Sequence, residues 1–166
     1  LLARYRYTDD FKCRLMGRIR NRIQFLAQHS HVPESRYAST LVSLAVDSKT
    51  GEYVIVHLGD GCILGIRGNG EIVMLSPPDN GLTRQETWLT TSDQALRHLR
   101  IKYGSVFHYR RIVLLSDGAE SICKGRNISV WAKNNLPHRE PEGIFDYIRR
   151  SAPTDDASCV VIDIRP

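Results

Sequence analysis

The sequence predicts an α+β fold of mainly antiparallel strands with helices covering them. The first observation is an amphipathic pattern over residues 9–29, which predicts a long helix. The second is a series of short strand patterns between residues 38 and 75, separated by turn residues. The third is that residues 54–56 and 112–115 are continuously apolar, as is typical of strands covered on both faces. Such strands require helices on the outside of the sheet.

The first helix is predicted from apolar residues that recur at spacings of three and four. They are Phe11, Leu15, Ile19, Ile23 and Leu26. Arginines lie between them, so one face of the helix is apolar and the other is charged. We expect the apolar stripe to cover a sheet.

Four strands are expected next, as an antiparallel meander. Their ranges are 38–47, 52–59, 62–67 and 71–75. Turn formers at residues 47–51 and 68–70 separate two of the pairs, and they include glycines that tolerate positive φ.

The second half of the chain is predicted to begin with an exposed loop at residues 76–86 and to end in a strand. The expected elements are a strand pair at 97–103 and 106–116, helices at 129–135 and 140–150, and a last strand at 157–164. Pro141 fits the first turn of the second helix, where a missing amide proton costs little.

Length and composition indicate one globular domain over residues 1–166, with 42% hydrophobic residues. No apolar stretch approaches the roughly 20 residues of a membrane helix, and no secretory signal is visible. The four cysteines form no CxxC pair, so a reducing cytoplasm is expected. The net charge of +5 comes from scattered arginine groups that we interpret as solvated faces, so neither nucleic acid nor membrane is expected as a partner.

Acidic residues follow or precede three strand patterns. Asp60 follows residues 54–59, Asp117 follows the apolar run 112–115, and Asp155 with Asp156 precedes the last strand. Carboxylates at strand ends can converge on a hard cation such as Mg2+ or Mn2+. Metal-assisted hydrolysis is therefore the leading hypothesis. The alternatives are a tight turn at Asp60, a helix cap at Asp117 and a loop at Asp155.

Three runs resemble the later motifs of the metal-dependent protein phosphatases of type 2C, in that family's order. They are HLGDG at 57–61, LLSDG at 114–118 and DDASCVV at 155–161. Residues 38–41 fit the strand opening that precedes these motifs, and Asn80-Gly81 with Glu86-Thr87 is similar to the divergent bacterial branch. The resemblance implies a four-layer α-β-β-α sandwich with a metal site at one end.

The resemblance also implies roles for individual residues. Asp117, followed by Gly118, matches the metal ligand of the SDG motif, and Asp155 matches the ligand of the C-terminal Asp-Asn motif. Asp60 matches the aspartate of the Gly-Asp motif. Asp156 stands where the family usually has asparagine. The resemblance implies that it lies beside the ligands or serves as an alternative ligand.

The implied activity is hydrolysis of phosphoserine or phosphothreonine in a protein substrate, which would be a kinase or its target, by a water activated between two or three Mn2+ or Mg2+ ions. Arg84 lies in the segment that resembles the family's flap and would contact substrate. The motifs assign no catalytic side chain beyond these residues.

One departure from the family pattern is the absence of an early Asp-Gly motif. Asp9-Asp10 is followed by Phe11 and resembles a helix start. We therefore expect a chain truncated at its N-terminus, lacking the first strand and the bridging aspartate, with weak activity of its own. The alternative is a pseudophosphatase or phosphoprotein-binding domain without hydrolysis.

Overall fold

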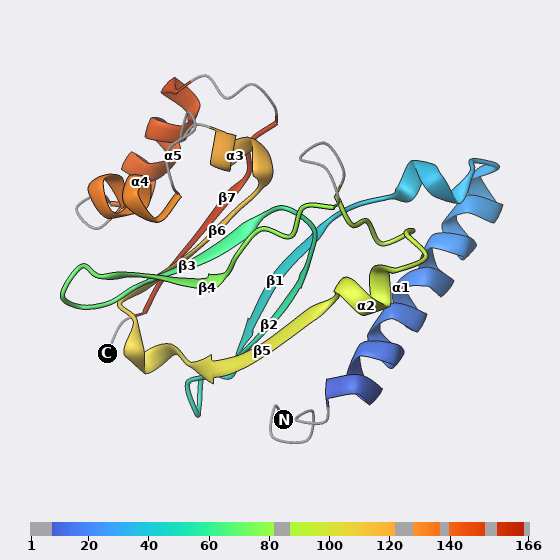
Figure 1. Ribbon diagram of the computed structural model, residues 1–166, viewed down its shortest axis with the longest axis horizontal. Helices are drawn as coiled ribbons and strands as arrows, with labels where there is room; N and C mark the ends of the chain where they lie inside the picture. The colour runs from blue at the N-terminus through green and yellow to red at the C-terminus, as the bar shows by residue number, and fades with distance from the viewer. Residues whose placement is uncertain (1–7, 82–86, 122–127, 137–139, 152–155, 165–166) are drawn as a thin grey trace. The chain divides into compact units, whose positions relative to one another are not determined.

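The computed structural model describes residues 8–81, 87–121, 128–136, 140–151 and 156–164 (Figure 1). It contains two antiparallel sheets with flanking helices, which confirms the α+β class. The chain divides into two compact units. Unit 1 comprises residues 1–60 and 79–104, and unit 2 comprises residues 61–78 and 105–166. The prediction of a single domain remains a prediction.

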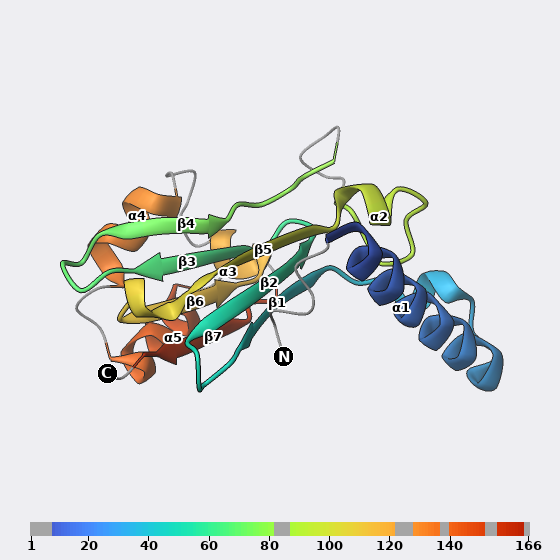
Figure 2. The same ribbon diagram turned by 90° about the horizontal axis from the view of Figure 1, so that it is seen from below.

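Unit 1 contains a three-stranded sheet in the order β1-β2-β5. Its elements are α1 (Thr8–Ser30), the 3-10 turn η2 (Glu34–Tyr37), β1 (Leu41–Val46), β2 (Glu52–Leu58), α2 (Ala95–His98) and β5 (Arg100–Ser105). The predicted helix at 9–29 is confirmed by α1. Phe11, Leu15 and Ile19 of the predicted stripe pack against a buried cluster that includes residues of β2, as expected. Met16, which is not part of that stripe, is also buried there. Figures 1 and 2 show α2 beside α1.

Unit 2 contains a four-stranded sheet in the order β4-β3-β6-β7. Its elements are β3 (Cys62–Ile66), β4 (Ile72–Ser76), the 3-10 turn η3 (Val106–His108), β6 (Arg111–Leu115), α3 (Asp117–Ser121), α4 (Ile128–Asn135), α5 (Pro141–Arg150) and β7 (Cys159–Asp163). Both predicted helices of the second half are therefore confirmed. The sequence analysis did not predict the short helices α2 and α3.

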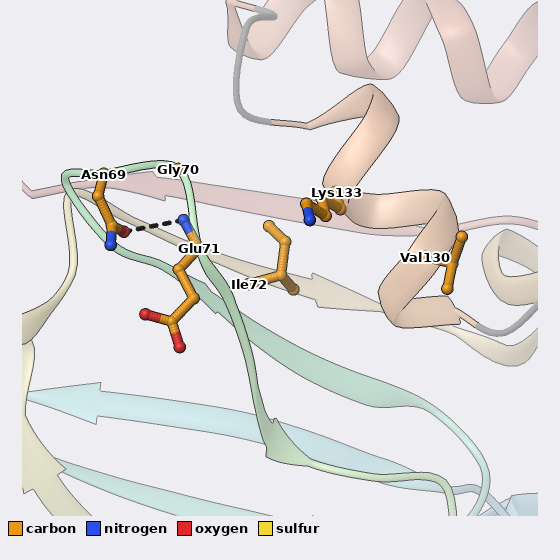
Figure 3. Close-up of a pocket in the computed structure, with 6 residues that line it drawn as sticks. All are labelled: Asn69, Gly70, Glu71, Ile72, Val130 and Lys133. Carbon is orange, nitrogen blue, oxygen red and sulfur yellow. Dashed lines mark hydrogen bonds between the residues drawn. The ribbon is translucent and has the colours of Figure 1, made fainter.

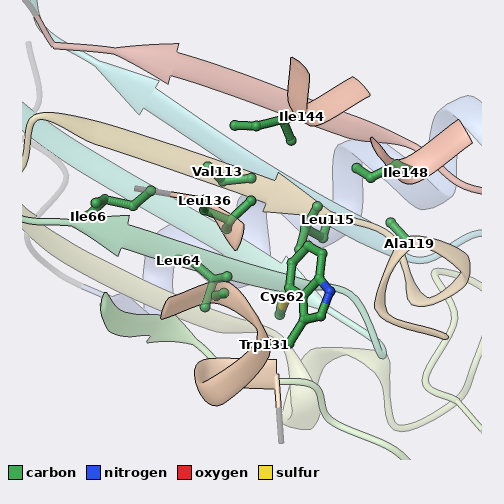
Figure 4. Packing of buried hydrophobic residues seen from close by; sticks show 11 residues of the cluster. Cys62, Leu64, Ile66, Val113, Leu115, Ala119, Trp131, Leu136, Ile144 and Ile148 are labelled. Carbon is green, nitrogen blue, oxygen red and sulfur yellow. The ribbon is translucent and has the colours of Figure 1, made fainter. Parts of the chain in front are cut away.

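The core of unit 2 is a cluster of buried apolar side chains between the sheet and its helices (Figure 4). Leu64, Val113 and Leu115 come from the strands, while Trp131 comes from α4 and Ile144 from α5. These helices bury part of their apolar residues, such as Trp131 and Ile144, against one face of the sheet. They leave polar and charged residues such as Lys133 exposed.

The predicted meander is wrong as a single sheet. β1 pairs with β2 and β3 pairs with β4, both antiparallel as expected, but the two hairpins belong to different sheets. β3 pairs instead with β6, with Cys62 opposite Leu115. The predicted pairing of residues 97–103 with 106–116 is also wrong, because β5 and β6 belong to different sheets. The physical reason is that β2 and β3 are both buried strands, and each pairs on its second side with a strand from later in the chain. β5 pairs with β2, and β6 pairs with β3.

The cysteines within the described residues are free thiols. Cys62 is fully buried in the unit 2 core, and Cys159 packs against it, which fits small core residues. Burial raises the pKa of the Cys159 thiol to about 12. None of the described helices combines the length and apolar character needed to cross a membrane.

Candidate functional site

Asp117 lies directly beyond the end of a buried strand, as the sequence predicted. All five residues of β6 are buried, Ser116 follows, and Asp117 is the exposed first residue of α3. The Ser116 hydroxyl accepts hydrogen bonds from the backbone N–H of Ala119 (3.4 Å) and of Ser158 (2.9 Å). The Ser116 N–H donates to the Ser158 carbonyl at 3.0 Å. Ser116 therefore ties together the end of β6, the start of α3 and the approach to β7.

This junction brings two of the acidic segments to the same end of the unit 2 sheet. β6 and β7 are antiparallel, with Leu115 opposite Cys159. Residues that follow β6 and residues that precede β7 therefore lie at the same end of the sheet. Asp117 belongs to the first group and Asp156 to the second, and both are exposed. Asp117 and Asp156 therefore lie at the same end of the unit 2 sheet, which we call the carboxylate edge.

The structure describes only some of the remaining predicted site residues. Asp155 and Arg84 lie outside the described residues. Gly118 is buried in the first turn of α3. Asp60 is half-buried in unit 1, so its convergence with Asp117 and Asp155 remains a prediction. Within the described ranges, no three His, Cys, Asp or Glu side chains form a group able to hold a metal ion.

The turn that carries Asp60 is tightly constrained. Gly59 has a φ of +102°, a conformation that L side chains rarely adopt. A Cβ at this position would lie 2.5 Å from Cγ2 of Thr40 and 3.1 Å from the carbonyl oxygen of Trp88. The Gly59 carbonyl also accepts a hydrogen bond from the Asp79 N–H at 2.9 Å. Segments before β1 and after β4 therefore fix the backbone immediately before Asp60.

Close to this turn, unit 1 holds a buried histidine beside an arginine. Nη2 of Arg100 on β5 lies 3.0 Å from Nδ1 of His57 on β2, and His57 is fully buried. Because a guanidinium only donates, Nδ1 must accept, and the imidazole is neutral with its proton on Nε2. Burial, followed by the positive charge of Arg100, lowers the pKa of His57 to about 4. Burial likewise lowers the pKa of Arg100, while Asp79 opposes this effect.

A second imidazole belongs to the same region of unit 1. His98 stacks on the Trp88 indole, with ring centroids 3.8 Å apart and planes 15° apart. Nδ1 of His98 lies 3.4 Å from Oδ2 of Asp79. Asp79 therefore joins the Gly59 turn through its backbone and the His98–Trp88 stack through its side chain.

Sequence reasoning missed this cluster of His57, Asp79, Trp88, His98 and Arg100. It placed Arg100 in a strand paired with the wrong partner. The available signal was a histidine within the otherwise apolar run of β2. An arginine partner became identifiable only once β5 was known to lie beside β2.

The chemistry of the predicted donor set fits a hard divalent cation. Asp60, Asp117, Asp155 and Asp156 offer only oxygen ligands, which suit Mg2+ and Mn2+. His57 is unsuited to join them as a ligand through Nδ1, because that nitrogen faces Arg100. We therefore consider the carboxylates as the metal-binding groups.

Comparisons with known proteins bear on the family and the fold. The family described as protein phosphatase 2C matches residues 4–158 of the chain. A search of curated proteins gave no match.

Solved structures with the same fold include bacterial phosphatases. A bacterial serine phosphatase is 16% identical with a TM-score of 0.61, covering 77% of this chain and 58% of its own. The serine/threonine phosphatase Stp1 from Staphylococcus aureus is 13% identical with a TM-score of 0.61, covering 78% and 57%. The phosphatase domain of SpoIIE from Bacillus subtilis, presoaked with Mn, is 15% identical with a TM-score of 0.53, covering 76% and 56%. The chain thus spans less than two thirds of the length of these three structures.

Proposed function

Because the chain belongs to the protein phosphatase 2C family, we propose that the protein is a metal-dependent phosphatase that hydrolyses phosphoserine and phosphothreonine in proteins. The observation that carries this proposal is the Ser116 junction, which holds the Asp117 segment beside the Asp156 segment. The likeness to solved phosphatases supports the fold on which this site depends.

We propose that Asp60, Asp117 and Asp155 hold Mn2+ or Mg2+, with Asp156 beside them or replacing Asp155. Asp60 stands two residues before Cys62 in the sequence, and Cys62 is the β3 residue opposite Leu115. Bound divalent ions supply the chemistry by lowering the pKa of water and by neutralising charge on the phosphoryl oxygens.

The contributions of the chain itself are positional. The Ser116 hydroxyl fixes the backbone on both sides of the carboxylate edge, since it accepts from Ala119 and from Ser158. The Asp79 N–H fixes the carbonyl of Gly59 before Asp60. Rigid placement matters because a metal centre requires its oxygen ligands in a defined geometry. Arg84 is proposed to contact the substrate phosphate.

The test is hydrolysis of p-nitrophenyl phosphate with Mn2+ by the full chain and by its Asp117→Asn variant. We expect the variant to fall below about one hundredth of the wild-type rate, because a direct ligand contributes at least as much as an outer partner. Calorimetric titration with Mn2+ should show weaker binding to the same variant. Asp93→Asn is the matched control, since Asp93 is exposed in unit 1 and takes no part in the proposed site. Unchanged turnover in Asp117→Asn would refute the assignment.

The second candidate is a phosphoprotein-binding domain without hydrolysis. It is the alternative that the sequence analysis left open, and Asp9 and Asp10 form part of the first turn of α1. Binding of a phosphoserine peptide together with no turnover in Mn2+ or Mg2+ would support this candidate. Turnover of the same peptide would exclude it.

A further inference from the structure

Unit 2 has a groove away from the carboxylate edge, between the β3–β4 turn and α4. Its volume is about 480 Å³, and Asn69, Gly70, Glu71 and Ile72 line one side while Val130 and Lys133 line the other (Figure 3). The turn side is well defined, because the Asn69 side-chain carbonyl accepts from the Glu71 N–H at 2.9 Å. Gly70 adopts a φ of +82°, and its N–H donates to the Arg67 carbonyl at 2.9 Å. The groove therefore has one wall held by a closed hairpin turn.

The groove borders the start of an edge strand, because Ile72 is the first residue of β4. β4 pairs with β3, and no other strand among the described residues pairs with it. The Arg67 N–H donates to the Glu71 carbonyl, so Ile66 and Ile72 form the next pair, and Gly65 and Val73 the one after. Hydrogen-bonded and non-hydrogen-bonded pairs alternate in an antiparallel ladder. The N–H and C=O of Ile72 therefore point away from β3, toward the open edge of the sheet.

The walls of the groove combine apolar surface with one positive charge. Val130 is 55% exposed on α4, and Ile72 lies opposite it (Figure 3). The Glu71 carboxylate points away from α4 in Figure 3 and is neutralised by Arg67, with Nη1 and Oε2 3.1 Å apart. Lys133 is exposed and makes no ion pair with any side chain of the described ranges.

We propose that this groove binds an acidic protein segment in an extended conformation, added as a further strand beside β4. The backbone groups of Ile72 would pair with the segment, as in other cases of strand addition to an open sheet edge. A side chain on one face of the added strand would contact Val130, and an acidic side chain would meet Lys133. We expect the bound segment to be acidic for two reasons. Among the described side chains of the groove, Lys133 carries the charge that no ion pair neutralises, and the whole chain has a net charge of +5.

The probe is a fluorescent eight-residue peptide in which valine and glutamate alternate at every second position with threonine between them, so that both face the same side of the added strand. Binding to the full chain is followed by anisotropy at low salt. We expect saturable binding that weakens as salt is added. Lys133→Glu should weaken binding by about tenfold, since like charges oppose each other across an interface. Lys49→Glu is the matched control, because Lys49 is exposed in the β1–β2 turn of unit 1 and makes the same change in net charge.

A second probe separates strand addition from simple charge attraction. The same peptide with every backbone amide N-methylated keeps its side chains but has no N–H left to donate at either edge, so we expect it not to bind. The proposal would be overturned if the N-methylated peptide, or a peptide with lysine in place of glutamate, bound the wild-type chain as tightly as the original peptide does. It would also be overturned if the original peptide bound Lys133→Glu as tightly as it binds the wild-type chain. Concentration-dependent dimerisation that masks the groove would also overturn it, by identifying a second copy as the occupant. Circular dichroism confirms folding of each variant, and none of these measurements depends on phosphatase activity.

Discussion

The two units each place an arginine on a strand, and they compensate its charge differently. In unit 2, Arg111 and Asp163 are opposite residues of β6 and β7, and two guanidinium nitrogens donate to the carboxylate, with Nη2 and Oδ2 3.0 Å apart. This hydrogen bonding raises the pKa of Arg111. In unit 1, Arg100 faces the neutral ring of His57, and burial lowers the pKa of both groups. A direct counter-ion stabilises the charge of Arg111, whereas Arg100 suppresses the charge of its neighbour.

The difference has a consequence for the candidate site. The Arg111–Asp163 pair lies at the end of β6 opposite to Ser116 and Asp117, so it stabilises the sheet at a distance from the carboxylates. His57, in contrast, lies near the end of strand β2, two residues before Gly59 and three before Asp60. Unit 1 therefore has a titratable buried group close in the chain to a proposed ligand, whereas the Arg111–Asp163 pair of unit 2 lies at the far end of its strands.

The largest expected effect is a loss of folding stability on replacing a glycine of unit 1, and a glycine of unit 2 serves as the comparison. Gly59→Ala should lower the free energy of unfolding by about 3 kcal/mol, because φ is +102° and the new Cβ would lie 2.5 Å from Thr40. Gly65→Ala places its Cβ 2.6 Å from the Tyr109 ring, but φ is ordinary and the ring can turn aside. We expect a cost of about 1 kcal/mol there.

Urea denaturation of both variants measures the two free energies. Equal losses would show that crowding, rather than the positive φ of Gly59, limits substitution. A loss for Gly59→Ala below that for Gly65→Ala would contradict the constrained turn.

The second effect is a pH dependence of stability that originates in unit 1. The pKa of His57 is lowered from 6.5 to about 4 by burial and by Arg100, with Lys102 adding to the effect and Asp79 and the Gly59 carbonyl opposing it. The unfolded chain therefore binds more protons than the folded chain between these values. Stability from this group is complete above pH 6.5 and is lost as the pH falls through about 4. Between about pH 7 and about pH 5 the loss should be about 2 kcal/mol.

Unfolding in urea at the two pH values tests this, with His57→Gln as the comparison. Glutamine can accept from Arg100 through its side-chain carbonyl but does not titrate, so the variant should show a smaller loss by the stated amount. An identical loss in both proteins would place the pH dependence elsewhere.

Local features of the fold were predictable from the sequence, and long-range pairing was not. The three- and four-residue spacing of apolar positions located α1, and the turn residues located the Arg67–Gly70 turn. The predicted meander placed residues 52–59 and 62–67 in one sheet, whereas β2 and β3 belong to different sheets. The Asp79 N–H bond to the Gly59 carbonyl, from 20 residues later in the chain, has no local signature.

The same limit applied to the site. Asp117 was identified correctly as a residue at the end of a buried strand, because an apolar run followed by Asp-Gly is a local pattern. The Arg100–His57 contact depends on the pairing of β2 with β5, which are separated by more than 40 residues. Sequence patterns therefore located the carboxylates, but not the groups that position the backbone around them.

The smallest expected effect tests whether the counter-ion of Arg111 contributes to stability in unit 2. Asp163→Asn should lower the free energy of unfolding by about 1.5 kcal/mol, because the buried guanidinium keeps its position but loses a charged acceptor. Asp146→Asn is the matched control: its carboxylate pairs with Arg149 at 2.9 Å and Arg150 at 3.7 Å, but both arginines are more than three quarters exposed. Exposed pairs contribute less than about 0.5 kcal/mol. Thermal and urea unfolding of both variants should therefore separate them, whereas equal small losses would mean that water solvates Arg111 as well as Asp163 does, and the contrast between the two arginines would then rest on His57 alone.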